Sequence, residues 1–225
     1  MSFATGFLPI QAQTRSNNND PSGNGRPPNR VDGGDRGGRC SATKTSANKN
    51  LIALVPATGE ALSTAESPTI LFYVPYASDS SLAARLSLHD ENGYRVIKPI
   101  QMTLSEIPGI VSLRLPIQLE RNKSYHWFFT IICDTTNGTN NAVVDGWIRR
   151  IEPSPTLARQ FKEKKSQQER AELYVKEGLW LDALAQLTHI PNTNRQADTD
   201  WTNLLQNLDL RAIAPEKIVP CCTFK

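Results

Sequence analysis

The chain has 225 residues, enough for one sizeable domain or two small ones, and a net charge of +3 from 25 basic and 22 acidic residues. So small an excess argues against a nucleic-acid partner and against an anionic membrane surface. No apolar run approaches the roughly 20 residues of a spanning helix, so no membrane span is predicted.

The first segment, residues 1–13, has features of a truncated signal peptide. Its apolar stretch, residues 3–10, is followed by Gln11 and Ala12, and the small alanine suits the last position of a cleavage site. A basic start is missing and the apolar core is short. We expect a periplasmic or secreted protein, with a cytoplasmic location as the alternative.

Residues 14–50 form a polar arm rich in glycine, proline and asparagine. Such a composition buries too little apolar surface to offset the entropy of ordering, which predicts disorder. The glycines and arginines of residues 32–39 resemble an RNA-binding element only superficially. Two aspartates dilute the charge, and no aromatic residue is present for base stacking.

Residues 51–152 have the pattern of a β-sandwich. Short strands follow one another with turn signals between them and no helical pattern, which favours an all-β, immunoglobulin-like sandwich over a parallel sheet. Asn92 and Gly93 form a strong hairpin signal. The strands are expected at residues 51–55, 69–74, 84–89, 94–104, 110–115, 125–133 and 142–151.

Three aromatic residues of this domain are predicted to be structural. Tyr125 follows Leu119 by six residues with a turn between them, and sandwiches of this kind use such a tyrosine hydroxyl to bond back to the backbone of the turn. Trp127 alternates with Tyr125 and is expected on the core face. Trp147, on the last strand, is assigned a structural role as well.

Residues 153–214 change to a helical period. Ser154 before Pro155 and the capping box at residues 166–169 predict helix starts. Residues 171–187 resemble the helix–glycine–helix centre of a tetratricopeptide repeat, but a single copy cannot form a solenoid. We expect a small helical hairpin packed on the sandwich, followed by a tail at residues 215–225. The partner-binding candidates are Tyr174, Trp180 and Trp201.

Four cysteines are present, and their spacing excludes a zinc site because no C-x-x-C pair occurs. Cys40 ends the arm and Cys133 ends the strand predicted at residues 125–133. In an exported chain the two are disulfide candidates, whereas in a reducing cytoplasm they would be buried thiols. Cys221 and Cys222 are expected to be free thiols in a frayed tail.

No catalytic constellation is recognised. His126 is expected to be a strand residue with a satisfied hydrogen bond, and His89 abuts a hairpin turn. Cys133 and His126 are predicted on opposite faces of one strand, which prevents them from acting together. We predict no enzyme activity, no catalytic or metal-binding residues and no cofactor.

A series of short motifs follows a recognisable order along the chain, at residues 33–40, 51–56, 68–76, 108–111, 123–127, 132–134 and 146–154. Together they resemble the DUF928 domain family, a cyanobacterial family of unknown function whose members usually begin with a signal peptide. The resemblance covers residues 30–214. It implies an extracytoplasmic protein, and it places Cys40 and Cys133 within the family pattern, which supports their pairing. It implies no activity or substrate.

The first hypothesis for function is a non-enzymatic interaction or scaffold module of the cell envelope. Its loops, or a groove beside Tyr174 and Trp180, would bind a protein or a glycan, although fold analogy alone sets this expectation. One alternative is a hydrolase acting on envelope material, which would need a cleft with shifted pKa values near His89 or His126. Another is a protein-binding module that uses the helical hairpin.

Overall fold

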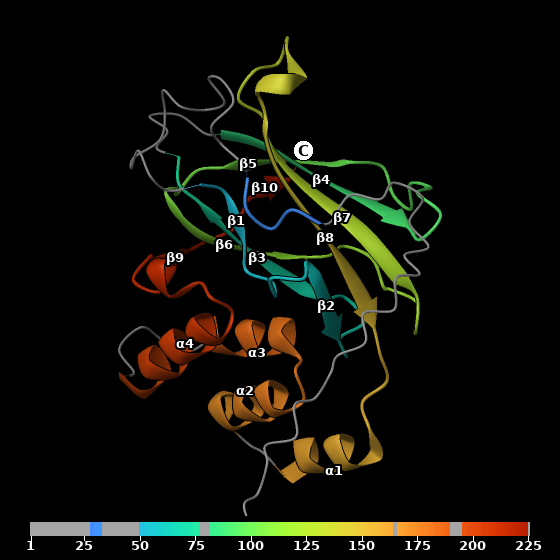
Figure 1. The fold of residues 1–225 in the computed structure, drawn as a ribbon, viewed down its shortest axis with the longest axis vertical. Helices are drawn as coiled ribbons and strands as arrows, with labels where there is room; N and C mark the ends of the chain where they lie inside the picture. Colours follow the sequence, from blue (N-terminus) through green and yellow to red (C-terminus); the bar gives the residue numbers. More distant parts are fainter. Residues whose placement is uncertain (1–27, 33–49, 77–81, 164–165, 190–194, 225) are drawn as a thin grey trace, which may run out of the picture.

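A computed structural model describes residues 28–32, 50–76, 82–163, 166–189 and 195–224. Within these residues the chain is mostly β-sheet, with two mixed sheets and four α-helices near its C-terminal end (Figure 1). The helices gather at one side of the sheets, and the last residues of the chain return to the strands.

The smaller sheet has four strands, and its last strand comes from the end of the chain. β3 lies between β1 and β6 in antiparallel pairs, and β9 adds to β6 in parallel. In sheet order the strands are β1 (Ile52–Ala53), β3 (Thr69–Val74), β6 (Gly109–Arg114) and β9 (Ile218–Val219).

The larger sheet has six strands. Its centre is the antiparallel set of β4, β7 and β8, and β2 pairs with β8 in parallel at one edge. In sheet order the strands are β10 (Thr223–Phe224), β5 (Ile100–Leu104), β4 (Leu82–Asp90), β7 (Ser124–Ile131), β8 (Ala142–Arg150) and β2 (Glu60–Ser63).

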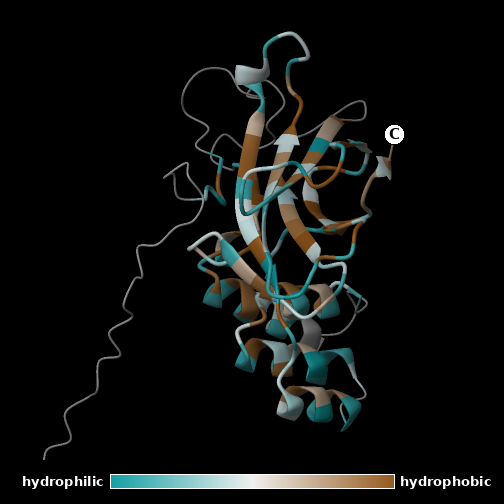
Figure 2. Ribbon diagram, turned by 90° about the vertical axis from the view of Figure 1, so that its right-hand side faces the viewer, coloured by the Kyte–Doolittle hydropathy of each residue, from teal (hydrophilic) through white to brown (hydrophobic). Residues whose placement is uncertain are grey.

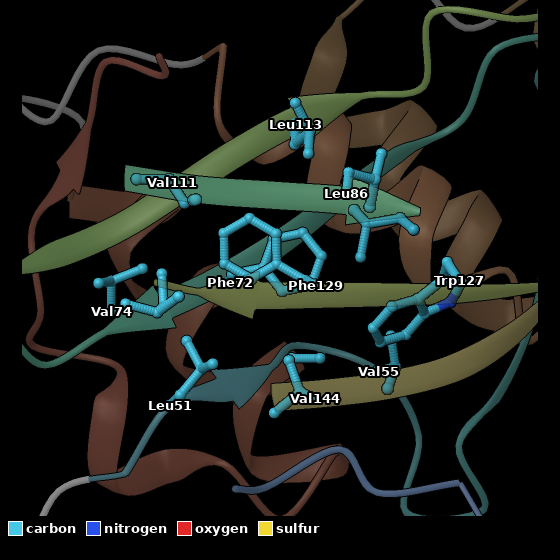
Figure 3. Close-up of a cluster of buried hydrophobic side chains, with 14 of the residues drawn as sticks. Leu51, Val55, Phe72, Val74, Leu86, Val111, Leu113, Trp127, Phe129 and Val144 are labelled. Atoms are coloured by element: carbon cyan, nitrogen blue, oxygen red, sulfur yellow. The ribbon is translucent and has the colours of Figure 1, made fainter. Parts of the chain in front are cut away.

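The two sheets enclose one apolar core because alternate residues of each strand point inward. Phe72 of the smaller sheet stacks on Phe129 of the larger one, with ring centroids 4.1 Å apart, and meets the edge of Trp127 at 5.6 Å (Figure 3). All three side chains are fully buried. Burying each contributes about 1.5–3 kcal/mol relative to exposure, so this aromatic contact is a main source of stability between the sheets.

The four helices are α1 (Pro155–Glu163), α2 (Gln167–Lys176), α3 (Trp180–Leu187) and α4 (Arg195–Asn207). A second core joins the helices to the outer face of the smaller sheet, where Leu71 and Tyr73 pack with Leu184 and Leu205. Figure 2 shows hydrophobic residues along the strands and polar residues on the outer sides of the helices. The smaller sheet is therefore covered on both faces.

The capping residues predicted from the sequence form the hydrogen bonds expected at helix starts. The Ser154 hydroxyl accepts the Leu157 N–H at 3.1 Å, and Ser166 and Glu169 form a complete capping box. Gly178, the glycine of the predicted helix–glycine–helix pattern, has φ of 72°, the left-handed conformation that suits glycine after a helix. These predictions are confirmed because each depends only on neighbours within one turn.

The tyrosine contact predicted near the start of β7 is present as well. The Tyr125 hydroxyl accepts the backbone N–H of Glu120 at 3.1 Å, and Leu119 is buried beneath the turn. Asn122 adopts φ of 60°, which turns the chain into the strand. This contact fixes the entry to β7, from which the side chains of the candidate site project.

Three differences from the sequence prediction concern strands. β2, β9 and β10 were not predicted, and the parallel pairs β2–β8 and β6–β9 make both sheets mixed. The predicted strand 94–104 forms only from Ile100, because residues 94–96 are exposed. The unpredicted strands have two to four residues, too few for a period to show.

The tail also differs from its prediction. Residues 215–225 were expected to be frayed with free thiols, but β9 and β10 pair with β6 and β5, and Cys221 is joined to Cys222 by a disulfide. Their Cα atoms lie 3.7 Å apart, and both residues pack against the main core. The prediction failed because adjacent cysteines rarely pair, so the sequence alone gave no reason to expect the bond.

Candidate functional site

Two hollows in the described part of the chain have the size of a small ligand group. One, of about 250 Å³, lies among α2, α3 and α4. The other, of about 230 Å³, lies beside Trp147 on the outer face of the larger sheet. We call them the helix pocket and the Trp147 pocket.

The helix pocket has an apolar floor and a polar rim. The floor consists of Ala171 and Val175 from α2, Leu187 from α3 and Leu204 from α4, and these residues belong to the helical core. The floor is firm because its side chains are already packed together. The rim consists of Gln168, Glu172, Lys176, Asp200, Asn203 and Asn207.

The predicted partner-binding residues Tyr174, Trp180 and Trp201 lie elsewhere in the helical segment. Trp201 is only 8% exposed and is part of the helical core, against which Tyr174 and Trp180 pack. Burial raises the pKa of Tyr174, and the charge of nearby Asp182 acts in the same direction. The three rings therefore contribute to the helical core and do not line the helix pocket. Their role in binding stays a prediction.

A buried carboxylate joins the helices to the larger sheet. Asp182, on α3, accepts the Ser63 hydroxyl at 2.5 Å, the Thr64 N–H at 2.7 Å and the Thr64 hydroxyl at 2.8 Å. Burial raises the pKa of Asp182, and these hydrogen bonds act in the opposite direction. Because Ser63 is fully buried and Asp182 nearly so, this cluster has no opening for a substrate and serves to hold α3 at the end of β2.

The outer face of the larger sheet carries a row of four side chains across four strands. His89 on β4 is the register partner of His126 on β7, which is the partner of Trp147 on β8, which is the partner of Glu60 on β2. Directly opposite residues point to the same face of a sheet. The sequence prediction treated these side chains separately, but the strand pairing brings them together.

His126 is the best-fixed member of this row. Its Nε2 lies 2.7 Å from an Asp145 carboxylate oxygen, which confirms the expected hydrogen bond. Its ring stacks on Trp147, with centroids 4.5 Å apart, and lies 4.2 Å from the ring of Phe128. Burial lowers the pKa of His89, and the charges of Arg95 and His126 lower it further. Burial therefore favours the neutral form of His89, whose ring centroid lies 5.3 Å from that of Phe128.

The described segment at residues 28–32 runs beside the Trp147 pocket, and its first residue, Pro28, lines the pocket. Asn29 exchanges two hydrogen bonds with Asp145, through its carbonyl at 3.0 Å and its N–H at 3.2 Å. Pro28 packs directly against Gly59, whose φ of 74° and lack of a side chain permit this approach. Of the pocket's lining, the residues with functional side chains are Glu60, Glu91, Ser124, Trp147 and Arg149.

Cysteine chemistry does not contribute to either pocket. Cys133 is disulfide-bonded, which leaves no thiol to act as a nucleophile with His126. Cys40, its predicted partner, lies outside the described residues, so that pairing stays a prediction. Within the described residues no group of three or more His, Cys, Asp or Glu side chains is placed to hold a metal ion.

A sequence signal for the Trp147 pocket was present but incomplete. His126 and Phe128 alternate with core residues on one strand, and Asp145 and Trp147 do the same on another, which is unusual for a solvated face. The signal indicates a partly covered outer face. Glu60 and Pro28 carry no such signal, because they reach the site only through pairing that is remote in sequence.

The fold defines a β-rich protein with two mixed sheets and four helices near its C-terminal end. No described helix is both long and apolar enough to cross a membrane. The chain belongs to the DUF928 family, a domain of unknown function, whose family model matches residues 31–218. No curated protein matches the chain.

Proposed function

We propose that the protein is a non-enzymatic, extracytoplasmic binding module that holds an extended segment of a partner protein in its helix pocket. The observation that carries this proposal is the combination of an apolar floor with Asn203 and Asn207, which lie one turn apart on α4 and at the rim. A carboxamide both donates and accepts hydrogen bonds, so two of them along a helix can pair with the backbone of an extended peptide.

The chemistry of the pocket specifies the peptide. A floor of four aliphatic side chains suits one large aliphatic side chain as an anchor. Glu172 and Asp200 provide two negative charges at the rim against one positive charge from Lys176. We therefore assign to the partner segment an aliphatic anchor with a lysine or arginine close to it.

Peptide selection tests this assignment. A random peptide library displayed on phage and selected on the purified protein should enrich an aliphatic residue with a basic neighbour. Replacing both Asn203 and Asn207 with alanine should weaken a selected peptide about tenfold, since each lost hydrogen bond contributes about 0.5–1.5 kcal/mol. Fluorescence anisotropy with the labelled peptide measures the change.

The matched control is Gln206→Ala, because Gln206 is exposed on the same helix and does not line the pocket. It should leave peptide affinity unchanged. Selected peptides without a common pattern, or equal binding by the double alanine variant, would contradict the proposal.

Two finer fold assignments accompany this proposal. An immunoglobulin-like sandwich is supported by the Tyr125 contact with the turn before β7. A hairpin of the tetratricopeptide kind is supported by the succession of α2, Gly178 and α3, which pack against each other. In that case the helix pocket would lie on the side of the hairpin that α4 covers. The rim residues of α4, Asn203 and Asn207, are therefore the first to replace.

An oxidising location is the second part of the proposal. The bond between Cys221 and Cys222 and the bonded state of Cys133 support a periplasmic or secreted protein, since disulfides persist mainly outside the cytoplasm. A non-reducing peptide map of protein from its native host should show Cys40 cross-linked to Cys133. Free thiols at both positions would contradict an oxidising location and favour the cytoplasm.

A hydrolase acting on envelope material is the alternative function. The facing pair of His89 and His126 beside a pocket is the feature that favours it. Against it, His126 is hydrogen-bonded to Asp145 and packed between Phe128 and Trp147, an arrangement that fixes the ring within the sheet face. We therefore favour binding over catalysis.

A further inference from the structure

The indole of Trp147 has different surroundings on its two faces. On one side His126 of β7 stacks on it, with ring planes 17° apart. β8 lies between β7 and β2, so Glu60 of β2 is the neighbour of Trp147 on the side away from His126, and both Trp147 and Glu60 line the pocket. An aromatic ring with one packed side and one side at a pocket is a platform for a second flat, apolar surface.

This platform is fixed before any ligand arrives. The His126 ring behind the indole is bound by Asp145, and Asp145 also accepts the backbone N–H of Asn29 at 3.2 Å. Both members of the His126–Asp145 pair are largely shielded, with side-chain exposures of 21% and 15%. Because the platform is preorganised, ordering it costs a ligand little free energy.

The polar groups around the platform restrict the ligand. Glu60 and Glu91 carry two negative charges and Arg149 one positive charge, and Ser124 adds a hydroxyl. The net negative charge opposes phosphates and carboxylates, which argues against nucleotides and uronic acids. Carboxylates are strong acceptors for hydroxyl and ammonium groups. A volume of about 230 Å³ has room for one six-membered ring that carries such hydroxyl or ammonium groups.

We propose that the Trp147 pocket binds a neutral or amino sugar unit of a glycan. The C–H face of the pyranose ring stacks on the indole of Trp147, and the hydroxyl or ammonium groups at its edge donate hydrogen bonds to Glu60 and Glu91. The site is separate from the helix pocket, so the module would hold a glycan at the sheet and a peptide at the helices.

Nuclear magnetic resonance with ¹⁵N-labelled tryptophan tests the proposal directly. The probes are a glucosamine tetramer, a cellotetraose and a galacturonic acid tetramer, each titrated into the full-length protein. The indole signal of Trp147 should shift with the first two probes and not with the third. The signals of Trp127, Trp180 and Trp201 should stay in place, since these residues do not line the pocket.

Variants separate the stacking contact from the charges. Trp147→Ala should abolish binding, and Trp180→Phe, the control in the helical segment, should leave it unchanged. Glu60→Gln, at an exposed position, should weaken the glucosamine tetramer about tenfold and the cellotetraose about threefold or less, because only the former uses the full charge.

Three outcomes would overturn the proposal: no Trp147 shift with either neutral or amino sugars, binding that survives Trp147→Ala, or a preference for the galacturonic acid tetramer. Glu60→Gln keeps the test decisive if Trp147→Ala disturbs the sheet. Failure here leaves the helix pocket untouched, because the two sites lie on different elements.

Discussion

Replacing Asp182 with alanine should lower the free energy of unfolding by about 3 kcal/mol or more, because buried hydrogen-bond donors would lose their partner. The wild-type carboxylate accepts three hydrogen bonds, one from Ser63 and two from Thr64. Ser63 has no access to water that could replace the lost acceptor. Urea unfolding followed by circular dichroism measures the loss.

Two further variants identify the cause. Asp182→Asn keeps an acceptor but adds a donor that faces other donors, so an intermediate loss is expected. Glu172→Ala removes an exposed carboxylate from the neighbouring helix and should change stability by no more than about 0.5 kcal/mol. A loss for Asp182→Ala no larger than that of Glu172→Ala would show that the buried cluster does not hold α3 to the sheet.

The raised pKa of Asp182 also predicts how the stability of the protein depends on pH. Burial raises the pKa of Asp182 above its ordinary value of 3.8, so the folded protein binds this proton more tightly than the unfolded chain. Ionisation of Asp182 therefore costs stability as pH rises above the ordinary pKa, and the cost is complete above the raised pKa. The stability advantage of wild type over Asp182→Asn should thus be largest in acid and shrink as pH rises through this window.

Contacts between residues close in the sequence were predicted better than the pairing of strands that lie far apart in the sequence. Ser154, Ser166, Gly178 and Tyr125 act within a few residues, and the structure shows each of their contacts. β2 could not be predicted in the same way, because its four residues pair with β8, which lies far from them in the sequence. Its pairing depends on the whole fold rather than on its own sequence.

The candidate site shows the same limit. The alternation of His126 with core residues indicates which face of β7 it occupies, and that face can be derived from the sequence. That His89, Trp147 and Glu60 join it depends on the register of three separate strand pairs. A shift of one residue in any pair would send a side chain to the opposite face, so the site exists only as a product of the fold.

Gly146→Ala should be the second strongly destabilising change, with an expected loss of about 3 kcal/mol from overpacking. A Cβ atom at this position would collide with the Cζ2 atom of Trp127 and lie 2.7 Å from the carbonyl oxygen of Gly59. Neither group can give way easily. Trp127 is fully buried, and the Gly59 carbonyl accepts the Trp147 N–H at 2.8 Å at the start of the β2–β8 pairing.

Gly138→Ala is the matched control, because a Cβ there would meet only the Asn141 side chain, at 3.8 Å, and stability should change by no more than about 0.5 kcal/mol. Trp127→Phe, which removes the atom that collides, should reduce the cost of adding Gly146→Ala. Thermal and urea unfolding of the two single variants and the double variant measure this coupling. Equal costs in both backgrounds would assign the loss to the Gly59 carbonyl instead, and with it to the pairing of β2 that places Glu60 beside Trp147.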